Sequence, residues 1–184
     1  MKHLADKLAV CKVGEDADIK ISNTRDEVLS RISLTCGRSA RVAINGIDVL
    51  NSSLEIYLAD SCELTIDAGQ LMNGPVRIYQ HEPTRVFIGE RCLFGGVDIW
   101  SSDMHSIIDV ETGQRVNRAR DIRIGARVWL GEEALVLKGS VIGHDCVVSA
   151  RAVVTEGTYP PHCILAGVPA RVIRTAITWD SRLL

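Results

Sequence analysis

The chain is poor in aromatic residues and has no excess of charge of either sign. Aromatic side chains make up only 4% of the 184 residues, and the formal net charge is -2. The small charge argues against a basic field that would attract nucleic acid. Because aromatics are scarce, a core must be filled by the small and medium aliphatic side chains among the 46% of hydrophobic residues.

Long apolar runs are also missing. No segment approaches the roughly 18 apolar residues of a membrane-spanning helix. The N-terminal segment from Met1 to Val13 mixes charged residues with short apolar pieces, whereas a signal peptide needs an apolar stretch there. We therefore expect a cytoplasmic protein without a membrane span, long enough for one domain with a sizeable core.

The cysteines do not form any CxxC pair, which argues against a metal site or a redox motif. A cytosolic chain of this size rarely needs disulfides. We therefore interpret the six cysteines as buried, reduced thiols. They are Cys11, Cys36, Cys62, Cys92, Cys146 and Cys163.

What the sequence does contain is an aliphatic residue at every sixth position of its C-terminal half. An α-helix rotates six residues by about 600°, so such a stripe would drift by about 120° at each step. Short strands with two inward positions, separated by bends, fit the pattern instead. Three of them close a coil of about 18 residues, which predicts a parallel β-helix. The aliphatic positions are Ile124, Leu130, Val136, Ile142, Val148 and Val154.

Small or β-branched residues precede these aliphatics by two positions, and glycine often follows them. Glycine at 125, 131 and 143 is expected to tolerate unusual φ and ψ at a bend. We call this six-residue spacing the frame. Extended toward the N-terminus in steps of six, it reaches Trp100, Phe94 and Ile88, and then Val76, Leu64 and Leu58. Cys62, Cys92 and Cys146 all fall on the small position, so we predict that they fill the core rather than react.

The departures from the frame define the domain organisation. We predict a single β-helix domain over residues 1–175, with irregular first coils at about 1–57 that cap one end. A polar excursion at about 101–121 forms a protruding loop, since interruptions of this length are usually functional or disordered. Pro160-Pro161 is expected to stop the repeat, and residues 176–184 form a short C-terminal tail that folds back on the coils.

His105, inside the excursion, is the candidate general base, because histidine is the side chain that most often transfers protons at physiological pH. Neighbouring Asp103 is expected to contact substrate or to orient the imidazole, although a backbone carbonyl would orient it equally well. Trp129 is predicted to point outward, either into an oligomer interface or into a ligand groove. The weaker histidines show no closely spaced pair, so no metal is expected; they are His3, His81, His144 and His162.

The stretch from 88 to 174 resembles the hexapeptide-repeat acetyltransferases. It is most similar to the sugar O-acetyltransferases, including galactoside and maltose acetyltransferases and those acting on capsular and other bacterial polysaccharides. The motifs that carry the resemblance are DMHS at 103–106, RIGARVWLG at 123–131, VVSARAVVT at 147–155 and LAGVPARVIR at 165–174. They cover about half the chain.

The resemblance implies a left-handed β-helix, a homotrimer, and active sites in grooves between neighbouring prisms. It also implies acetyl-CoA as the acetyl donor, with His105 as the catalytic base and Trp129 beside the thioester. Coenzyme A would run along the last coils, past the positions of Ala150, Thr155 and Arg174. A cation at Arg174 suits the coenzyme phosphates.

Two positions depart from the family pattern. Glu156 follows Thr155 where many relatives carry lysine, so one coenzyme-facing cation is lost. Glu132 stands where relatives often carry serine or alanine close to the thioester, so only its backbone N–H would serve the oxyanion.

The leading prediction is acetyl transfer from acetyl-CoA to a hydroxyl of a sugar or polysaccharide. Two alternatives stay open: N-acetylation of an amino or nucleotide sugar, and a non-catalytic β-helix scaffold, because repeat architecture alone implies no function.

Overall fold

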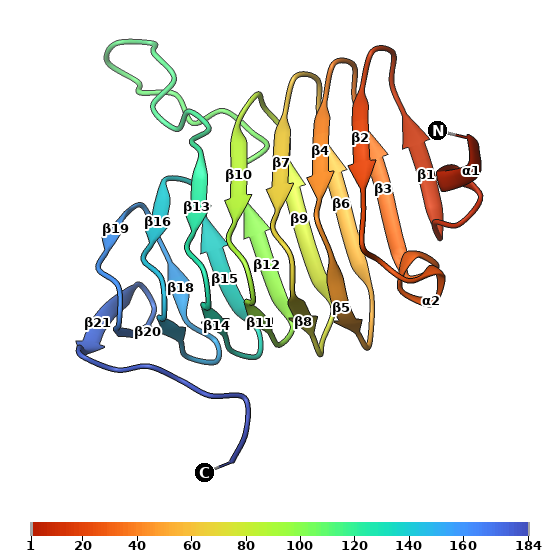
Figure 1. The fold of residues 1–184 in the computed structure, drawn as a ribbon. Coiled ribbons are helices and arrows are strands. Elements are labelled where there is room, and N and C mark those ends of the chain that lie inside the picture. Colours follow the sequence, from red (N-terminus) through yellow and green to blue (C-terminus); the bar gives the residue numbers. More distant parts are fainter. Residues whose placement is uncertain (1, 184) are drawn as a thin grey trace.

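The fold of the chain, in a computed structural model, is a three-sided coil of parallel strands (Figure 1). The structure describes residues 2–183, with side chains from residue 4 onward, so the side chain of His3 lies outside the described residues. Sheet A contains, in spatial order, β1 (Val10–Val13), β3 (Ile32–Cys36), β6 (Leu54–Leu58), β9 (Val76–Gln80), β12 (Val97–Trp100), β15 (Ala134–Leu137) and β18 (Val153–Val154).

The other two sides are sheets B and C. Sheet B contains β19 (Gly157–Tyr159), β16 (Ser140–Ile142), β13 (Ile122–Ile124), β10 (Arg85–Ile88), β7 (Glu63–Ile66), β4 (Arg41–Ile44) and β2 (Asp18–Ile21). Sheet C contains β21 (Ala170–Arg174), β20 (Ile164–Gly167), β17 (Val147–Val148), β14 (Trp129–Leu130), β11 (Leu93–Phe94), β8 (Gln70–Met72) and β5 (Ile47–Leu50).

The coil is a left-handed parallel β-helix, which confirms the predicted fold class. Strands in the interior of each sheet pair with the strand one coil earlier and the strand one coil later, as β9 does with β6 and β12. Two short helices, α1 (Lys2–Ala5) and α2 (Asp26–Leu29), lie at the N-terminal end (Figure 1). Neither helix in residues 2–183 has the length or apolar character that crossing a membrane requires.

The core confirms the six-residue frame of the C-terminal coils. Every aliphatic from Ile124 to Val154 in that frame is at most 1% exposed, and so is each small residue that precedes it. Cys62, Cys92 and Cys146 are fully buried and unbonded. Burial raises the pKa of the Cys92 thiol to about 12, so these thiols fill the core as predicted.

The glycines of the frame are needed for a different reason from the one expected. No left-handed φ occurs at Gly125; instead, a Cβ there would lie 2.7 Å from the backbone nitrogen of His144 on the next coil. The left-handed conformation falls on non-glycine corner residues, including Arg127 and Asp145 with φ of 53° and 56°. Close approach of stacked coils therefore selects glycine here.

The N-terminal coils are regular, but their period is longer than that of the C-terminal coils. Ile56 stacks on Ile78 in the N-terminal part, whereas Val136 stacks on Val154 in the C-terminal part, so the step between stacked partners differs by four positions. The added positions lengthen the A and B sides. Strand β6 buries three alternate side chains, those of Leu54, Ile56 and Leu58, whereas β18 is only Val153–Val154. We call these two parts the wide coils and the narrow coils.

The longer period corrects the backward extension of the frame. Ile99, not Trp100, points into the core; Trp100 lies on the outer face. Gln70 is a polar residue at an inward position; it is fully buried, and its Nε2 donates to the carbonyl of Gly89 at 2.9 Å. Glu82 is outside the core, because the adjacent inward position is Gln80.

The C-terminal end also differs from expectation. Pro160-Pro161 does not stop the repeat, since β20 follows it and pairs in parallel with β17. The β-helix ends one strand later, where β21 turns back antiparallel to β20. The tail then folds back on the coils as predicted, with Trp179 Nε1 donating to the carbonyl of Arg127 at 2.6 Å.

Candidate active site

His105 lies in the excursion of residues 101–121, which leaves the coil after β12 and returns at β13 (Figure 1). Its side chain is exposed, so the imidazole is available to a ligand. The backbone of His105 is held at both ends: its N–H donates to the carbonyl of Asp103 at 2.7 Å, and its carbonyl accepts from Asn117 Nδ2 at 2.8 Å. The excursion therefore fixes the main chain and leaves the ring free.

Asn117 organises the excursion from within. It is only 7% exposed, and its Oδ1 accepts from the N–H of Ile107 at 2.7 Å. Its Nδ2 also donates to Oδ2 of Asp103 at 2.8 Å. One buried amide thus ties the returning arm of the excursion to the segment that carries His105. Sequence reasoning missed this residue, because nothing in its pattern separates it from an exposed loop asparagine.

Asp103 does not contact the imidazole of His105. Its carboxylate instead accepts from Lys138 Nζ and Asn117 Nδ2. Burial alone would raise the pKa of Asp103, but hydrogen bonds from Lys138 and Asn117 lower it overall. Asp103 therefore stays ionised and anchors the excursion to the residue that follows β15.

A second anchor lies at the root of the excursion. Arg115 makes a bidentate ion pair with Glu82 at 2.6 and 2.7 Å, and Ser102 Oγ donates to Glu82 at 2.6 Å. Hydrogen bonds from Arg115 and Ser102 lower the pKa of Glu82 to about 2. Fork-to-carboxylate pairing of this kind fixes orientation as well as distance. The excursion is therefore tied to the wide coils as well as to the narrow ones.

Beneath this anchor, the enlarged corner between sheets A and B is polar. Gln80 Nε2 donates to the carbonyl of Thr84 at 2.8 Å, and the hydroxyls of Thr84 and Ser101 lie 2.7 Å apart. All three residues are buried. These bonds connect Gln80 through Thr84 to Ser101, where the excursion begins, while Gln80 Oε1 is buried without a hydrogen-bond partner.

His81 is the other functional candidate near His105, and it was only a weak candidate in the sequence. Burial lowers its pKa, and the charge of His105 lowers it further. Its ring lies 4.8 Å from that of Tyr57, centroid to centroid. Its segment, YQHEPTR at 79–85, interrupts the six-residue repeat, and this interruption is the only signal in the sequence.

Trp129 points outward, as predicted, and is 40% exposed. It lines a groove of about 590 Å³ together with Glu132 and Ala150. Its ring lies 6.2 Å from the ring of Trp179 in the C-terminal tail. The structure thus brings three of the predicted coenzyme residues to one groove.

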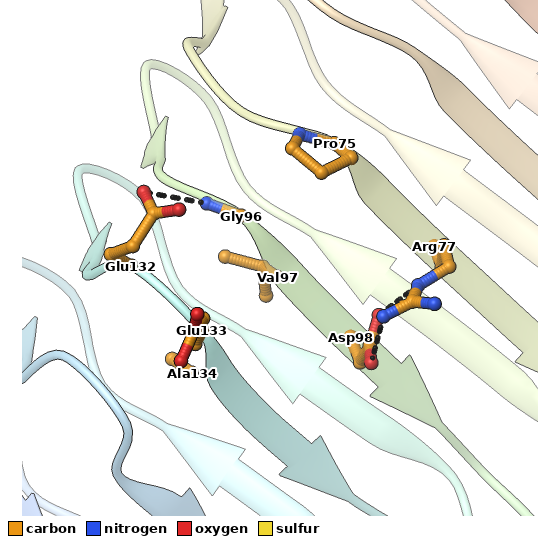
Figure 2. A pocket seen from close by; sticks show the side chains of 8 residues that line it. All are labelled: Pro75, Arg77, Gly96, Val97, Asp98, Glu132, Glu133 and Ala134. Carbon is orange, nitrogen blue, oxygen red and sulfur yellow. Dashed lines mark hydrogen bonds and ion pairs between the residues drawn. The ribbon is translucent and has the colours of Figure 1, made fainter.

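The side chain of Glu132 points toward the previous coil. Its Oε2 accepts from the N–H of Gly96 at 3.3 Å (Figure 2). Figure 2 also shows Glu133 beside it and the ion pair of Arg77 with Asp98 farther along sheet A. The carboxylate of Glu132 is therefore held by a backbone N–H on a stacked coil.

Thr155 and Arg174 lie outside the residues that line the Trp129 groove. Arg174 ends β21, where it is exposed, and Thr155 follows β18, where its carbonyl accepts from the hydroxyl of Tyr159 at 3.0 Å. Glu156 is ion-paired with Arg120 at the end of the excursion. Glu156 therefore connects the last coils to the excursion.

One chain does not bring His105 and Trp129 together. The excursion projects from the corner where sheets A and B meet. Strand β14 belongs to sheet C, which is the side of the prism opposite that corner (Figure 1). Each half of the predicted site is formed separately on the coil.

His144 and His162 do form a close pair, which sequence reasoning missed. They lie one coil apart, and their ring centroids are 4.8 Å from each other, with Asp145 beside them. The Asp145 carboxylate already accepts from Arg127 Nε at 2.8 Å and from Thr178 at 3.1 Å. We assign this cluster to docking of the C-terminal tail.

Comparison with known proteins supports an acyltransferase. No family model matches the chain. A polysialic acid O-acetyltransferase of Neisseria meningitidis is 34% identical over 173 residues, which cover 93% of this chain and 79% of that protein. A solved polysialic acid O-acetyltransferase superposes with a TM-score of 0.72 at 27% identity, covering 95% of this chain and 93% of the other.

A second solved structure, of a polysialic-acid-specific acetyltransferase, superposes with a TM-score of 0.58, covering 96% of this chain and 90% of the other. At 22% identity it supports the fold alone.

A left-handed coil of six-residue repeats, one extended loop with an exposed histidine, and an outward tryptophan in a groove define a hexapeptide-repeat acyltransferase. This confirms the resemblance seen in the sequence. The chain belongs to the family of the polysialic acid O-acetyltransferases.

Proposed function

We propose that this protein transfers the acetyl group of acetyl-CoA to a hydroxyl of a sialic acid polymer. The observation that carries the proposal is the 34% identity with the Neisseria meningitidis enzyme over 93% of the chain. That match includes the wide coils and the excursion, which differ most from a plain six-residue repeat.

His105 acts as the general base in the proposed reaction. Its imidazole removes the proton from the acceptor hydroxyl, whose oxygen attacks the thioester carbon. The tetrahedral oxyanion collapses, the C–S bond breaks, and the imidazolium returns its proton to the sulfur of coenzyme A. Proton transfer by a positioned group contributes roughly 10²–10⁴ in rate. The exposed ring and fixed backbone of His105 support this role.

The acetyl donor is proposed to lie in the Trp129 groove. Its lining by Glu132 and Ala150 and its apolar walls of Leu93 and Val148 suit the thioester arm of acetyl-CoA. The oxyanion would be stabilised by the backbone N–H of Glu132 or by the indole N–H of Trp129. Thr155 and Arg174 would contact the coenzyme farther along the last coils, where the guanidinium suits a phosphate.

The separation of His105 from Trp129 leads us to propose a homotrimer. In a ring of three parallel prisms, the excursion of one copy reaches the Trp129 groove of its neighbour, and Asp103 lies on the acceptor side. Three equivalent sites result. Sedimentation or mass photometry should show three copies, and mixing His105→Ala with Trp129→Ala subunits should restore activity if the two residues act across the interface.

The direct test is turnover with purified protein. Acetyl-CoA and polysialic acid should release free coenzyme A thiol only when both are present, and His105→Ala should abolish release while acetyl-CoA binding survives. Undiminished turnover by His105→Ala would overturn the general-base assignment. Transfer to amino sugars instead of hydroxyls would favour the N-acetyltransferase alternative, and absence of acetyl-CoA binding would favour a scaffold. Cytoplasmic location remains a prediction, which cell fractionation would test.

A further inference from the structure

The outer face of sheet A carries a row of aromatic side chains that the proposed chemistry does not use. Tyr57, Tyr79 and Trp100 occupy the same register position on β6, β9 and β12. We call this row the aromatic ladder. Tyr57 is 37% exposed, and the rings of Tyr79 and Trp100 lie 5.8 Å apart. Because only 4% of the chain is aromatic, this alignment on an outer face points to a role.

His81 extends the ladder sideways and connects it to the excursion. Its ring lies 4.8 Å from Tyr57 and 6.0 Å from Tyr79. The neighbouring residue Glu82 is bonded to Ser102 and Arg115, which hold the root of the excursion. Trp100, the last rung, directly precedes the excursion, so the ladder ends at the segment that carries the proposed base.

A hollow continues the ladder at its other end. It has a volume of about 420 Å³ and is lined by residues that include Thr35, Tyr57, Asp60 and His81. A path therefore runs along the prism axis from this hollow, over the rungs, to the root of the excursion. Successive rungs are one strand spacing apart, about 4.8 Å, which is of the order of one sugar residue.

The chemistry of the ladder fits a carbohydrate. Tyrosine and tryptophan present apolar ring faces, and the C–H faces of pyranose rings stack on such surfaces. Because burial lowers the pKa of His81, its ring is neutral and suits stacking at neutral pH. Arg77, in the adjacent outward row, is ion-paired with Asp98 and gives the face a polar margin.

A second copy of the chain fits this part of sheet A less well. Outward residues beside the ladder are charged, namely Glu55, Arg77 and Asp98. On the narrow coils the same two outward rows are aliphatic, with Leu135, Leu137 and Val153. Depletion of charge is typical of the centre of an interface between proteins. The aliphatic part therefore suits contact between copies, and the aromatic part suits a ligand.

We propose that the aromatic ladder and its hollow form an extended subsite for the polysaccharide acceptor, which lies along sheet A with its modified residue at the excursion. This proposal rests on the proposed function. Such a subsite makes the protein selective for a polymer over a single sugar, since a monosaccharide at the excursion contacts only Trp100. It also gives the wide coils a role separate from the donor groove.

The test measures acceptor binding without turnover. Calorimetry with polysialic acid and with its monomer should show tighter binding of the polymer by the wild type. The double variant Tyr57→Ala/Tyr79→Ala should weaken polymer binding by about tenfold and leave the affinity for acetyl-CoA unchanged. Tyr57→Phe should retain most of the affinity because the ring face remains. Phe87→Ala is the matched control, an outward aromatic on sheet B.

The possible results distinguish failure of the subsite proposal from failure of the proposed function. Unchanged polymer binding by the double variant, with normal acetyl transfer in the wild type, would overturn the ladder and leave the function standing. A wild type that neither binds nor acetylates the polymer would overturn both. If the double variant dissociates in size-exclusion chromatography, the ladder is an interface between copies and the proposal is wrong.

Discussion

The wide and narrow coils share one architecture but differ in cross-section. In the wide coils, sides A and B each have three inward side chains, whereas every side of the narrow coils has two. Side C is nearly constant, and it carries the Trp129 groove. The added corner positions become polar toward the excursion, passing from Leu58 to Gln80 and Ser101. The wider corner thus buries more apolar surface and also forms the polar site from which the excursion that carries His105 projects.

The largest effect is expected in the core of the wide coils. Ile56 is 1% exposed at the centre of β6, and Ile56→Ala should lower the free energy of unfolding by about 2–5 kcal/mol. Val136 occupies the equivalent inward row of the narrow coils and is fully buried. Val136→Ala removes less volume and should cost less. Urea unfolding, at matched protein concentration, measures both.

The two core variants form a matched pair, because both remove a branched side chain from the same row of sheet A. A cost for Val136→Ala equal to or above that for Ile56→Ala would contradict the view that the wide coils carry more of the apolar stabilisation.

The next effect concerns the excursion and should be confined to the acceptor half of the site. Asn117→Ala removes the bonds to Ile107, Asp103 and the carbonyl of His105. Loss of a buried group that positions a reacting side chain by fractions of an ångström can cost on the order of 10²-fold in rate. We expect kcat to fall at least about tenfold, while acetyl-CoA affinity, set by the Trp129 groove, is retained.

A fall in acetyl-CoA affinity together with kcat would mean that Asn117 supports the whole fold rather than the excursion. Asn45→Ala is a suitable control, since Asn45 Nδ2 donates to Asp67 Oδ1 on a corner of the wide coils away from both the excursion and the Trp129 groove.

A smaller, pH-dependent effect is expected at the Glu82 anchor. Hydrogen bonds from Arg115 and Ser102 depress the pKa of Glu82 to about 2, below its ordinary value near 4.5. A depressed carboxyl pKa stabilises the folded state above the ordinary value, and that contribution is lost as the pH falls toward 2. Hydrogen exchange in the excursion, corrected for intrinsic rates, should therefore increase below about pH 4.5 in the wild type.

Glu82→Gln should show the faster exchange already at pH 7 and a flatter pH profile. Glu133→Gln is its control, because the ion pair of Glu133 with Arg151 lies on the exposed surface of the narrow coils. Identical profiles for wild type and Glu82→Gln would show that this anchor does not restrain the excursion.

How much of the structure the sequence predicts depends on the period. The six-residue frame from Ile124 to Val154 predicts the narrow coils residue by residue, because two positions per side leave little choice. The six-residue pattern does not describe the wide coils, because their three sides span eight, eight and six residues. No single period therefore repeats along that part of the sequence. A strict frame therefore places Trp100 inward, which is wrong. The contacts of His81 and the edge-to-face pair of His144 with His162 depend on which coils lie side by side, and that follows only once the coil length is known.

The smallest effects are expected for ion pairs on the outer faces of the two regions. Arg77 pairs with Asp98 at 2.6 Å on the wide coils, and Arg151 pairs with Glu133 at 2.7 Å on the narrow coils. The Asp98 side chain is 24% exposed and that of Glu133 is 59% exposed, so water screens the second pair more strongly. Exposed pairs contribute about 0.2–1 kcal/mol.

Arg77→Met should therefore lower the free energy of unfolding by an amount near the upper end of that range, and Arg151→Met by an amount near zero. Urea unfolding in low and high salt would separate the two, because the Arg77 effect should shrink with salt while the Arg151 variant stays at the wild-type value. A larger loss for Arg151→Met would mean that the narrow coils depend on their surface charges more than their buried side chains indicate.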